Sequence, residues 1–259
     1  MAGVFRAGVV RFILSIAAIA IVSVAAAPLN AATPIEEDIV AQISNSQSEY
    51  YYPNLILRYE MGDPTLTLDD YHYLYYGFAY QAEYKPLATN PHMDKFLLLA
   101  SNIDIESPNE EVLREIIKAG DDALIHDPFN PKVWNMLAYV HGVLGDEERE
   151  MAAAQRVEMI LATIRLSGDG LKQKSPQHII MFDHALDLLA AENINHRDAV
   201  VVSRTVEYIP LLVPKRLDGE KIKGFYYDFG RIYWNKPEGV SYKRDRTWQF
   251  NNLPPKEYK

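Results

Sequence analysis

A proline-marked junction between two helical patterns constrains the fold of this chain more than any other feature. Residues 119–146 (AGDDALIHDPFNPKVWNMLAYVHGVLGD) have the pattern of a helix that ends, a turn at Pro128 and a second helix that begins. Proline lacks an amide hydrogen and clashes with the preceding helical turn, so it ends a helix. The stretch therefore predicts two antiparallel helices joined at Pro128, with Trp134 packed between them.

The spacing of residues across this junction resembles that of a tetratricopeptide repeat. In such repeats, small residues let neighbouring helices approach closely and bulky residues fill the space between them. The matching residues here are Ala123, Pro128, Trp134, Leu137, Ala138 and His141. The match then fails, because His141 replaces an aromatic residue and Glu150 replaces the next small one. Stacks of this kind need about three repeats for stability, so we expect a packed helix hairpin rather than a long array with a peptide-binding groove.

Helical patterns occupy most of the chain before residue 170. We expect helices near residues 34–47, 54–62, 92–102, 109–127 and 147–166. Thr67 and Asp70 have the spacing of a capping box, so a further helix is predicted to begin at Leu68. Gly168 and Gly170 end the helical pattern.

The chain changes character after residue 170. Residues 178–194 have the pattern of a short strand that runs into a helix, and residues 202–213 and 222–234 are rich in β-branched and aromatic residues. Because RLDGEK between them contains an Asp-Gly turn signal, we predict a β-hairpin. The fold class is therefore α+β and mostly helical: tetratricopeptide-like helix hairpins in residues 33–166 are followed by a small antiparallel β-hairpin or sheet. Residues 167–235 form the α+β part of the same domain, and residues 236–259 form a polar extended tail, partly packed through Trp248 and Phe250.

The first 32 residues have the layout of a secretory signal peptide. Arg6 and Arg11 precede an apolar run at residues 12–27, and small residues in PLNAAT follow. The run is shorter than the roughly 20 residues that a membrane-spanning helix needs, although an uncleaved N-terminal anchor is the alternative. We expect cleavage after Ala31 or Ala32, export to the periplasm or the medium, and no integral membrane span afterwards.

Composition excludes several kinds of site. The chain has no cysteine, so disulfides, zinc–thiolate sites and thiol nucleophiles are excluded. Its net charge of −9 disfavours nonspecific binding to nucleic acid. No nucleophile elbow, phosphate loop or dinucleotide fingerprint occurs. We therefore expect no nucleic-acid partner and assign no catalytic residue, cofactor or metal ligand.

Three segments together are distinctive: the Tyr-rich block at residues 51–87, SGDG at residues 167–170 and KGFYYDFGRIYW at residues 223–234. With these segments, about residues 48–235 resemble a family of exported bacterial proteins, the domain of unknown function 4919 family. The resemblance implies a secreted or periplasmic globular protein. It attaches no activity and no cofactor to the chain.

Ten of the seventeen tyrosines lie between Tyr50 and Tyr84. On the helix expected there, one stripe contains Tyr71, Leu74, Tyr75 and Phe78, and a second contains Tyr73, Tyr76, Gly77 and Tyr80. Tyrosine rings with a polar tip suit a platform for sugars, aromatic ligands or peptides. The alternative is that the rings fill the core and their hydroxyls bond internally. A platform requires several accessible hydroxyls within one concave patch, and a fully packed block would exclude it.

Other polar residues have simpler interpretations. SGDG closes a helix, where the dipole has the wrong sign for phosphate, so a glycine cap and turn explains it better. His178, Asp183 and His184 match no zinc spacing, and we do not expect them to bind metal. The side chains that we single out as a candidate ligand or partner surface are Tyr73, Tyr76, Tyr80, Trp134, His141, Asp169 and His178.

These observations favour an exported, non-enzymatic binding or scaffold protein of the cell envelope, whose partner is an envelope protein or a peptide. Two alternatives stay open. One is a secreted hydrolase whose site is assembled from distant residues, and the other is a small-ligand or glycan-binding protein that uses the Tyr-rich helix. The side chains that converge in a pocket discriminate among them.

Overall fold

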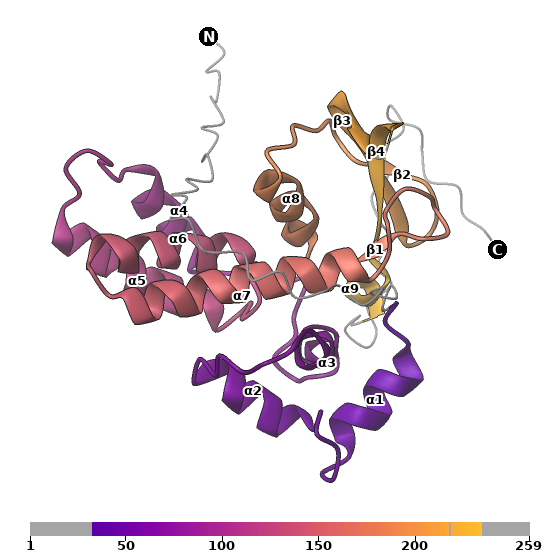
Figure 1. Cartoon of the computed structure of the whole chain (residues 1–259), viewed down its shortest axis with the longest axis horizontal. Helices are drawn as coiled ribbons and strands as arrows, with labels where there is room; N and C mark the ends of the chain where they lie inside the picture. Colours follow the sequence, from indigo (N-terminus) through magenta and orange to yellow (C-terminus); the bar gives the residue numbers. More distant parts are fainter. Residues whose placement is uncertain (1–32, 218, 235–259) are drawn as a thin grey trace.

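The computed structural model describes residues 33–217 and 219–234 (Figure 1). The expected signal peptide at residues 1–32 lies outside the described residues. So does the expected tail at residues 236–259, with Trp248 and Phe250.

Helices dominate the described part of the chain. They are α1 (Glu36–Ser44), α2 (Tyr52–Glu60), α3 (Leu68–Phe78), α4 (Met93–Ser101), α5 (Glu110–Leu124), α6 (Pro131–Val143), α7 (Glu147–Leu166), α8 (Phe182–Ala191) and α9 (Gly230–Trp234). The strands are β1 (Gln177–His178), β2 (Val200–Val201), β3 (Val206–Leu217) and β4 (Glu220–Asp228). The mostly helical α+β class predicted from the sequence is confirmed.

The start of α3 follows from the two residues that predicted it. The Asp70 amide donates to the Thr67 hydroxyl over 3.1 Å, and the Thr67 amide donates to the Asp70 carboxylate over 2.8 Å. This reciprocal pair satisfies two amides that the first helical turn leaves without partners. The predicted capping box is confirmed.

The junction near Pro128 joins two helices, but the second helix begins three residues later. Asn130 caps α6, because its side-chain oxygen accepts the Val133 amide over 3.1 Å. Helix α5 packs on α4 and α6, and α6 packs on α7. Trp134 is half-buried where the two hydrophobic clusters of the molecule meet, so it packs against more than the two helices that Pro128 joins.

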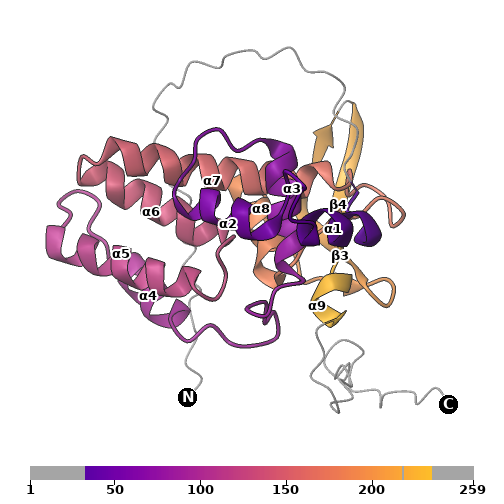
Figure 2. The same cartoon turned by 90° about the horizontal axis from the view of Figure 1, so that it is seen from below.

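Helix α7 links the helical part to the sheet. It runs along the molecule from α6 towards β1, and it also packs against α3 (Figures 1 and 2). Side chains from both ends of the described part of the chain join one cluster, which includes Ile39 of α1, Tyr75 of α3, Ile164 of α7 and Tyr227 of β4. None of the helices in the described ranges combines the length and apolar character needed to cross a bilayer.

The sheet has the order β1-β4-β3-β2. Strands β3 and β4 form the predicted antiparallel hairpin, and Gly219 at its turn has a φ of +86°, which favours glycine. The expectation of an antiparallel sheet is wrong in one respect, because β1 pairs in parallel with β4 and the sheet is mixed. The turn after α7 is the reason: the Gly170 carbonyl accepts the Tyr226 amide over 2.7 Å and directs β1 along β4.

Candidate functional site

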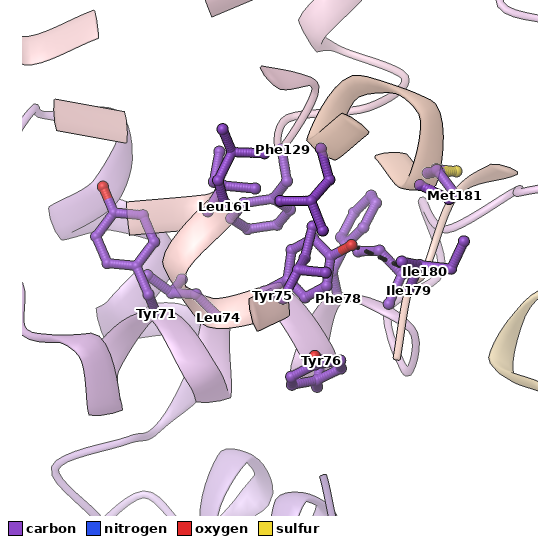
Figure 3. Packing of buried hydrophobic residues seen from close by; sticks show 14 of the residues in the cluster. Tyr71, Leu74, Tyr75, Tyr76, Phe78, Phe129, Leu161, Ile179, Ile180 and Met181 are labelled. Carbon is purple, nitrogen blue, oxygen red and sulfur yellow. Dashed lines mark hydrogen bonds between the residues drawn. The ribbon is translucent and has the colours of Figure 1, made fainter. Parts of the chain in front are cut away.

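The inner face of α3 is a tyrosine core. Tyr71, Tyr75 and Tyr76 are buried in the cluster drawn in Figure 3. The Tyr76 hydroxyl donates to the His178 carbonyl over 3.0 Å, and the Tyr84 hydroxyl donates to the Ile180 carbonyl over 2.7 Å. Internal hydrogen bonds of this kind offset the cost of burying a phenol. Most of the tyrosine block therefore fills the core.

This packing corrects part of the candidate surface. Tyr76 is 0 % exposed, so it cannot belong to a surface that meets a ligand. The Arg231 guanidinium lies over its ring, 5.2 Å from the centroid, and closes the space on that side. The second stripe of α3 is therefore not wholly exposed, because its Tyr76 turns into the core.

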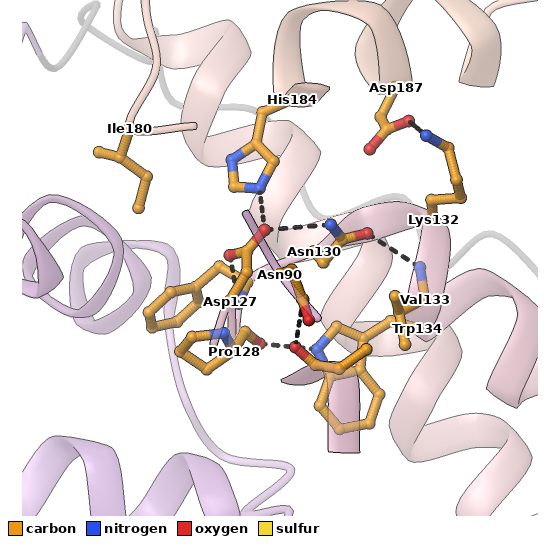
Figure 4. A network of polar contacts seen from close by, with 12 residues as sticks. Asn90, Asp127, Pro128, Asn130, Lys132, Val133, Trp134, Ile180, His184 and Asp187 are labelled. Carbon is orange, nitrogen blue, oxygen red and sulfur yellow. Dashed lines mark hydrogen bonds and ion pairs between the residues drawn. The ribbon is translucent and has the colours of Figure 1, made fainter. Parts of the chain in front are cut away.

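A buried polar network joins α3, α8 and the loop before α6. Figure 4 shows the contacts between α8 and that loop. His184 Nε2 lies 3.0 Å from Asp127 Oδ2, and His184 Nδ1 lies 2.8 Å from the Tyr75 hydroxyl. That hydroxyl also accepts the Ile180 amide over 3.3 Å, and the Asn130 amide group donates to Asp127 Oδ2 over 3.0 Å. Every polar atom in this chain of contacts has a partner.

The electrostatics of His184 follow from its enclosure. Burial disfavours its charged ring, but the Asp127 carboxylate with its hydrogen bond, together with the charges of Asp187 and Asp183, outweighs burial, so the pKa of His184 is raised. His184 and Tyr75 are 0 % exposed, and Asp127 is 5 % exposed. A carboxylate, a histidine and a hydroxyl in this order suit proton transfer, yet a substrate cannot reach them here. The network fastens three elements together.

A pocket of about 320 Å³ lies on the opposite side of α3, against α1. Its lining residues come from three short stretches at the amino-terminal end of the described chain. They are Thr33, Ile35, Asp38, Tyr50, Asp69, His72 and Tyr73. Of the side chains that the sequence singled out, Tyr73 is the one that the structure places in this pocket.

Two stacked rings form the aromatic part of the pocket. The centroids of Tyr50 and Tyr73 are 4.2 Å apart, with 25° between the ring planes. The Tyr73 hydroxyl donates to Asp38 Oδ2 over 2.8 Å. Burial, and then this hydrogen bond, raise the pKa of Tyr73, and burial raises the pKa of Tyr50, with Glu49 adding to it. Both rings are therefore neutral phenols at physiological pH.

His72 contributes a third ring, half-buried beside the stack. It packs edge-on against Tyr73 at 5.2 Å and against Tyr76 at 5.1 Å between centroids. Burial, with a smaller contribution from Arg231, lowers the pKa of His72. The ring is therefore neutral at pH 7, and the charged groups of the lining are the carboxylates of Asp38 and Asp69.

The remaining candidate residues lie elsewhere. His141 is buried on α6, and its Nδ1 lies 3.9 Å from the Asp146 carboxylate. The prediction that His141 belongs to a ligand or partner surface is therefore wrong. Trp134 is half-buried under Arg156, whose guanidinium carbon lies 4.3 Å from the ring centroid. Tyr80 is half-buried after α3. These side chains do not converge on one site.

Asp169 and His178 have local roles. Asp169 is exposed, and its carboxylate accepts the Leu171 amide over 2.8 Å and the Ser175 hydroxyl over 2.6 Å, which shapes the turn after α7. His178 is half-buried on β1, and burial lowers its pKa. Within residues 33–217 and 219–234, no three His, Asp or Glu side chains group as metal ligands.

Sequence reasoning missed most of the pocket. Asp38, Tyr50, Asp69 and His72 carry no motif, and their convergence depends on how α1 packs on α3. One signal was present: Tyr50 and Tyr73 both belong to the Tyr-rich block. The hydrogen bond between His184 and Asp127, which spans 57 residues, had no signal in the sequence.

Comparison with known proteins places the chain in a family. The family model described as "Domain of unknown function (DUF4919)" matches residues 37–237. The chain belongs to this family. The match covers the helices and strands from α1 to α9 apart from Glu36, the first residue of α1, and it includes every pocket residue except Thr33 and Ile35. No curated protein and no solved structure matches the chain, so the tetratricopeptide resemblance stays a prediction.

Proposed function

We propose that this protein is an exported, non-enzymatic binding protein that holds a small ligand in the pocket between α1 and α3. The observation that carries the proposal is the stacked pair Tyr50–Tyr73 beside the Asp38 and Asp69 carboxylates. Ligand sites commonly occupy 300–1,000 Å³ and combine aromatic walls with a few polar groups that fix the ligand's orientation. The pocket has a volume and a lining of this kind.

The lining favours binding over catalysis. A general base must hydrogen-bond the group that it activates, and a nucleophile needs such a base beside it. Among the described lining residues, His72 has no hydrogen bond to a carboxylate or a hydroxyl, and it packs against rings instead. The histidine–carboxylate pair that could transfer a proton, His184 with Asp127, is enclosed in the core. Among the described residues, the pocket therefore offers the hydrolase alternative no hydrogen-bonded histidine–carboxylate pair.

A thermal-shift screen of small molecules tests the proposal. We expect ligands that raise the midpoint of unfolding, because binding to the folded state alone stabilises it. The shift should disappear in Tyr50→Ala, which removes one ring of the stack. Tyr208→Ala is the matched control, since it removes a half-buried ring from another tyrosine pair, Tyr208–Tyr226 on the sheet. A screen without binders, or binders unaffected by Tyr50→Ala, would overturn the proposal.

Export is tested separately by cell fractionation and mass spectrometry of the purified chain. The expected result is a protein in the periplasm or the medium that begins after Ala31 or Ala32. Recovery from the cytoplasm with residues 1–32 attached would contradict this part of the proposal.

Partner binding by the helical part is a second candidate. Leu98 on α4, Ile105 after it and Ile125 at the end of α5 are 63 %, 57 % and 76 % exposed. Exposed apolar side chains mark a contact with another protein where they form one contiguous patch, and the experiment below tests whether these do. Affinity capture from the envelope fraction should recover a partner that Leu98→Glu with Ile125→Glu releases, whereas Tyr50→Ala should leave it bound.

A further inference from the structure

We infer that the pocket between α1 and α3 takes an organic cation: a small molecule that carries an ammonium or guanidinium group on an apolar body. This inference rests on the proposed function, because it names the class of ligand for that same pocket. Three observations carry it: two carboxylates without a cationic partner among the described residues, a stacked pair of rings beside them, and a cavity of about 320 Å³ that connects them.

The carboxylates of the pocket differ from others near them. Asp70, one residue from Asp69, lies 3.6 Å from the Arg58 guanidinium, and Asp63 lies 2.7 Å from it. Asp38 and Asp69 have no such contact with any Lys, Arg or His in the part of the chain that the structure describes. Asp38 accepts a hydrogen bond from Tyr73, which fixes its position without neutralising it. The pocket therefore has negative charge available for a ligand.

The aromatic rings favour the same class of ligand. The face of a tyrosine ring attracts a cation electrostatically when the cation is within about 6 Å of the centroid. The protein uses this contact internally, because Arg156 lies 5.1 Å from the Tyr59 centroid and 4.3 Å from the Trp134 centroid. In the pocket, the rings of Tyr50 and Tyr73 stand beside carboxylates instead of a cation.

Charge also decides against a neutral ligand. A neutral sugar or alcohol that filled the pocket would displace part of the water around these two exposed carboxylates without supplying a counter-charge, and that desolvation is unfavourable. An ammonium or guanidinium group forms charge-assisted hydrogen bonds with the same carboxylates, and these are about twice as strong as neutral ones. The space around the cationic group can hold an apolar body against the two rings.

Isothermal titration calorimetry with two isosteric probes tests the inference on the intact protein. The cationic probe is 2-phenylethylammonium, and the neutral probe is 2-phenylethanol, which has the same body and no charge. We expect the cation to bind about tenfold more tightly, since a hydrogen bond to a charged group exceeds a neutral one by roughly 1.4 kcal/mol, a factor of ten in affinity.

Two variants that each lose one negative charge test whether the tighter binding of the cation depends on the pocket. Asp69→Asn should weaken binding of the cation about tenfold and leave the alcohol unchanged. Glu37→Gln is the matched control, because Glu37 is an exposed acid on α1 beside Asp38 that does not line the pocket. It should change the affinity of the cation less than about twofold, as expected for a screened surface charge.

The outcomes separate the ligand class from the proposed function. Equal affinities for the two probes would overturn the inference that the ligand is a cation. Binding of a neutral disaccharide such as maltose that Tyr50→Ala abolishes would overturn it too, and both results would leave ligand binding in this pocket intact. If neither probe binds and the small-molecule screen finds no ligand sensitive to Tyr50→Ala, both proposals fail. Equal losses in Asp69→Asn and Glu37→Gln would assign the effect to overall charge and would also overturn the inference.

Discussion

The two faces of α3 carry the same kind of residue in different surroundings. On the inner face, the Tyr75 hydroxyl meets His184 Nδ1 at 2.8 Å and the Ile180 amide at 3.3 Å. On the outer face, the Tyr73 hydroxyl donates to Asp38, and the Asp38 and Asp69 carboxylates have no described cationic partner. The comparison shows that a stripe of tyrosines does not itself distinguish a core from the wall of a pocket. The distinction lies in whether the neighbouring polar groups are already satisfied inside the protein.

The strongest test of the inner face removes the carboxylate at the centre of its network. Asp127→Ala would leave His184 Nε2 and the Asn130 amide group without their acceptor in a fully buried place. We expect a loss of about 3–5 kcal/mol in the free energy of unfolding, the usual cost of breaking a buried charged pair. Chemical denaturation monitored by tryptophan fluorescence measures it.

Asp122→Ala is the control for that substitution. Asp122 is a half-exposed acid on α5, and replacing it should change stability by less than about 0.5 kcal/mol. Similar losses in both variants would show that the network does not hold α3, α8 and the start of α6 together.

Removing single hydroxyls compares the two faces directly. Tyr75→Phe should cost about 1–3 kcal/mol, because it leaves the Ile180 amide and His184 Nδ1 without a partner in the core. Tyr73→Phe should cost under about 1 kcal/mol, because water can replace its hydroxyl at the Asp38 carboxylate. Equal costs in denaturation experiments would remove the distinction between core and pocket.

The smallest expected effect concerns the pKa values of two histidines, His184 at the inner face of α3 and His72 at the outer face. The raised pKa of His184 means that its protonation adds stability below its ordinary value of 6.5, and that this contribution is lost as the pH rises through the folded-state pKa. The lowered pKa of His72 has the opposite sign: its contribution is present above 6.5 and is lost as the pH falls through the folded-state pKa. An NMR titration of the imidazole signals should give a midpoint above 6.5 for His184 and below it for His72. A reversed order would contradict the electrostatic description of both faces.

Local features of the fold could be predicted from the sequence. Thr67 and Asp70 marked the start of α3 because a capping box is complete within four residues. The Asp-Gly turn marked the hairpin of β3 and β4 for the same reason. The parallel pairing of β1 with β4 could not be predicted, because it depends on where the turn after α7 returns the chain.

The site depended on packing that no local pattern encodes. The Tyr-rich block indicated where an aromatic surface would be sought, and Tyr73 does line the pocket. Tyr76 was assigned to the same surface because both side chains share one stripe of an ideal helix. Its ring is instead covered by Arg231 from α9, which lies 155 positions further along the chain. Asp38 and Asp69 could be assigned to the pocket only from the packing of α1 against α3.

A crystal structure of the protein with 2-phenylethylammonium tests the central claim most directly. We predict density for the ligand in the pocket between α1 and α3, with its ammonium group within hydrogen-bonding distance of Asp38 or Asp69 and its ring against Tyr50 or Tyr73. Density for the ligand elsewhere, or a pocket filled by another part of the chain, would contradict the claim that the outer face of α3 is a ligand site.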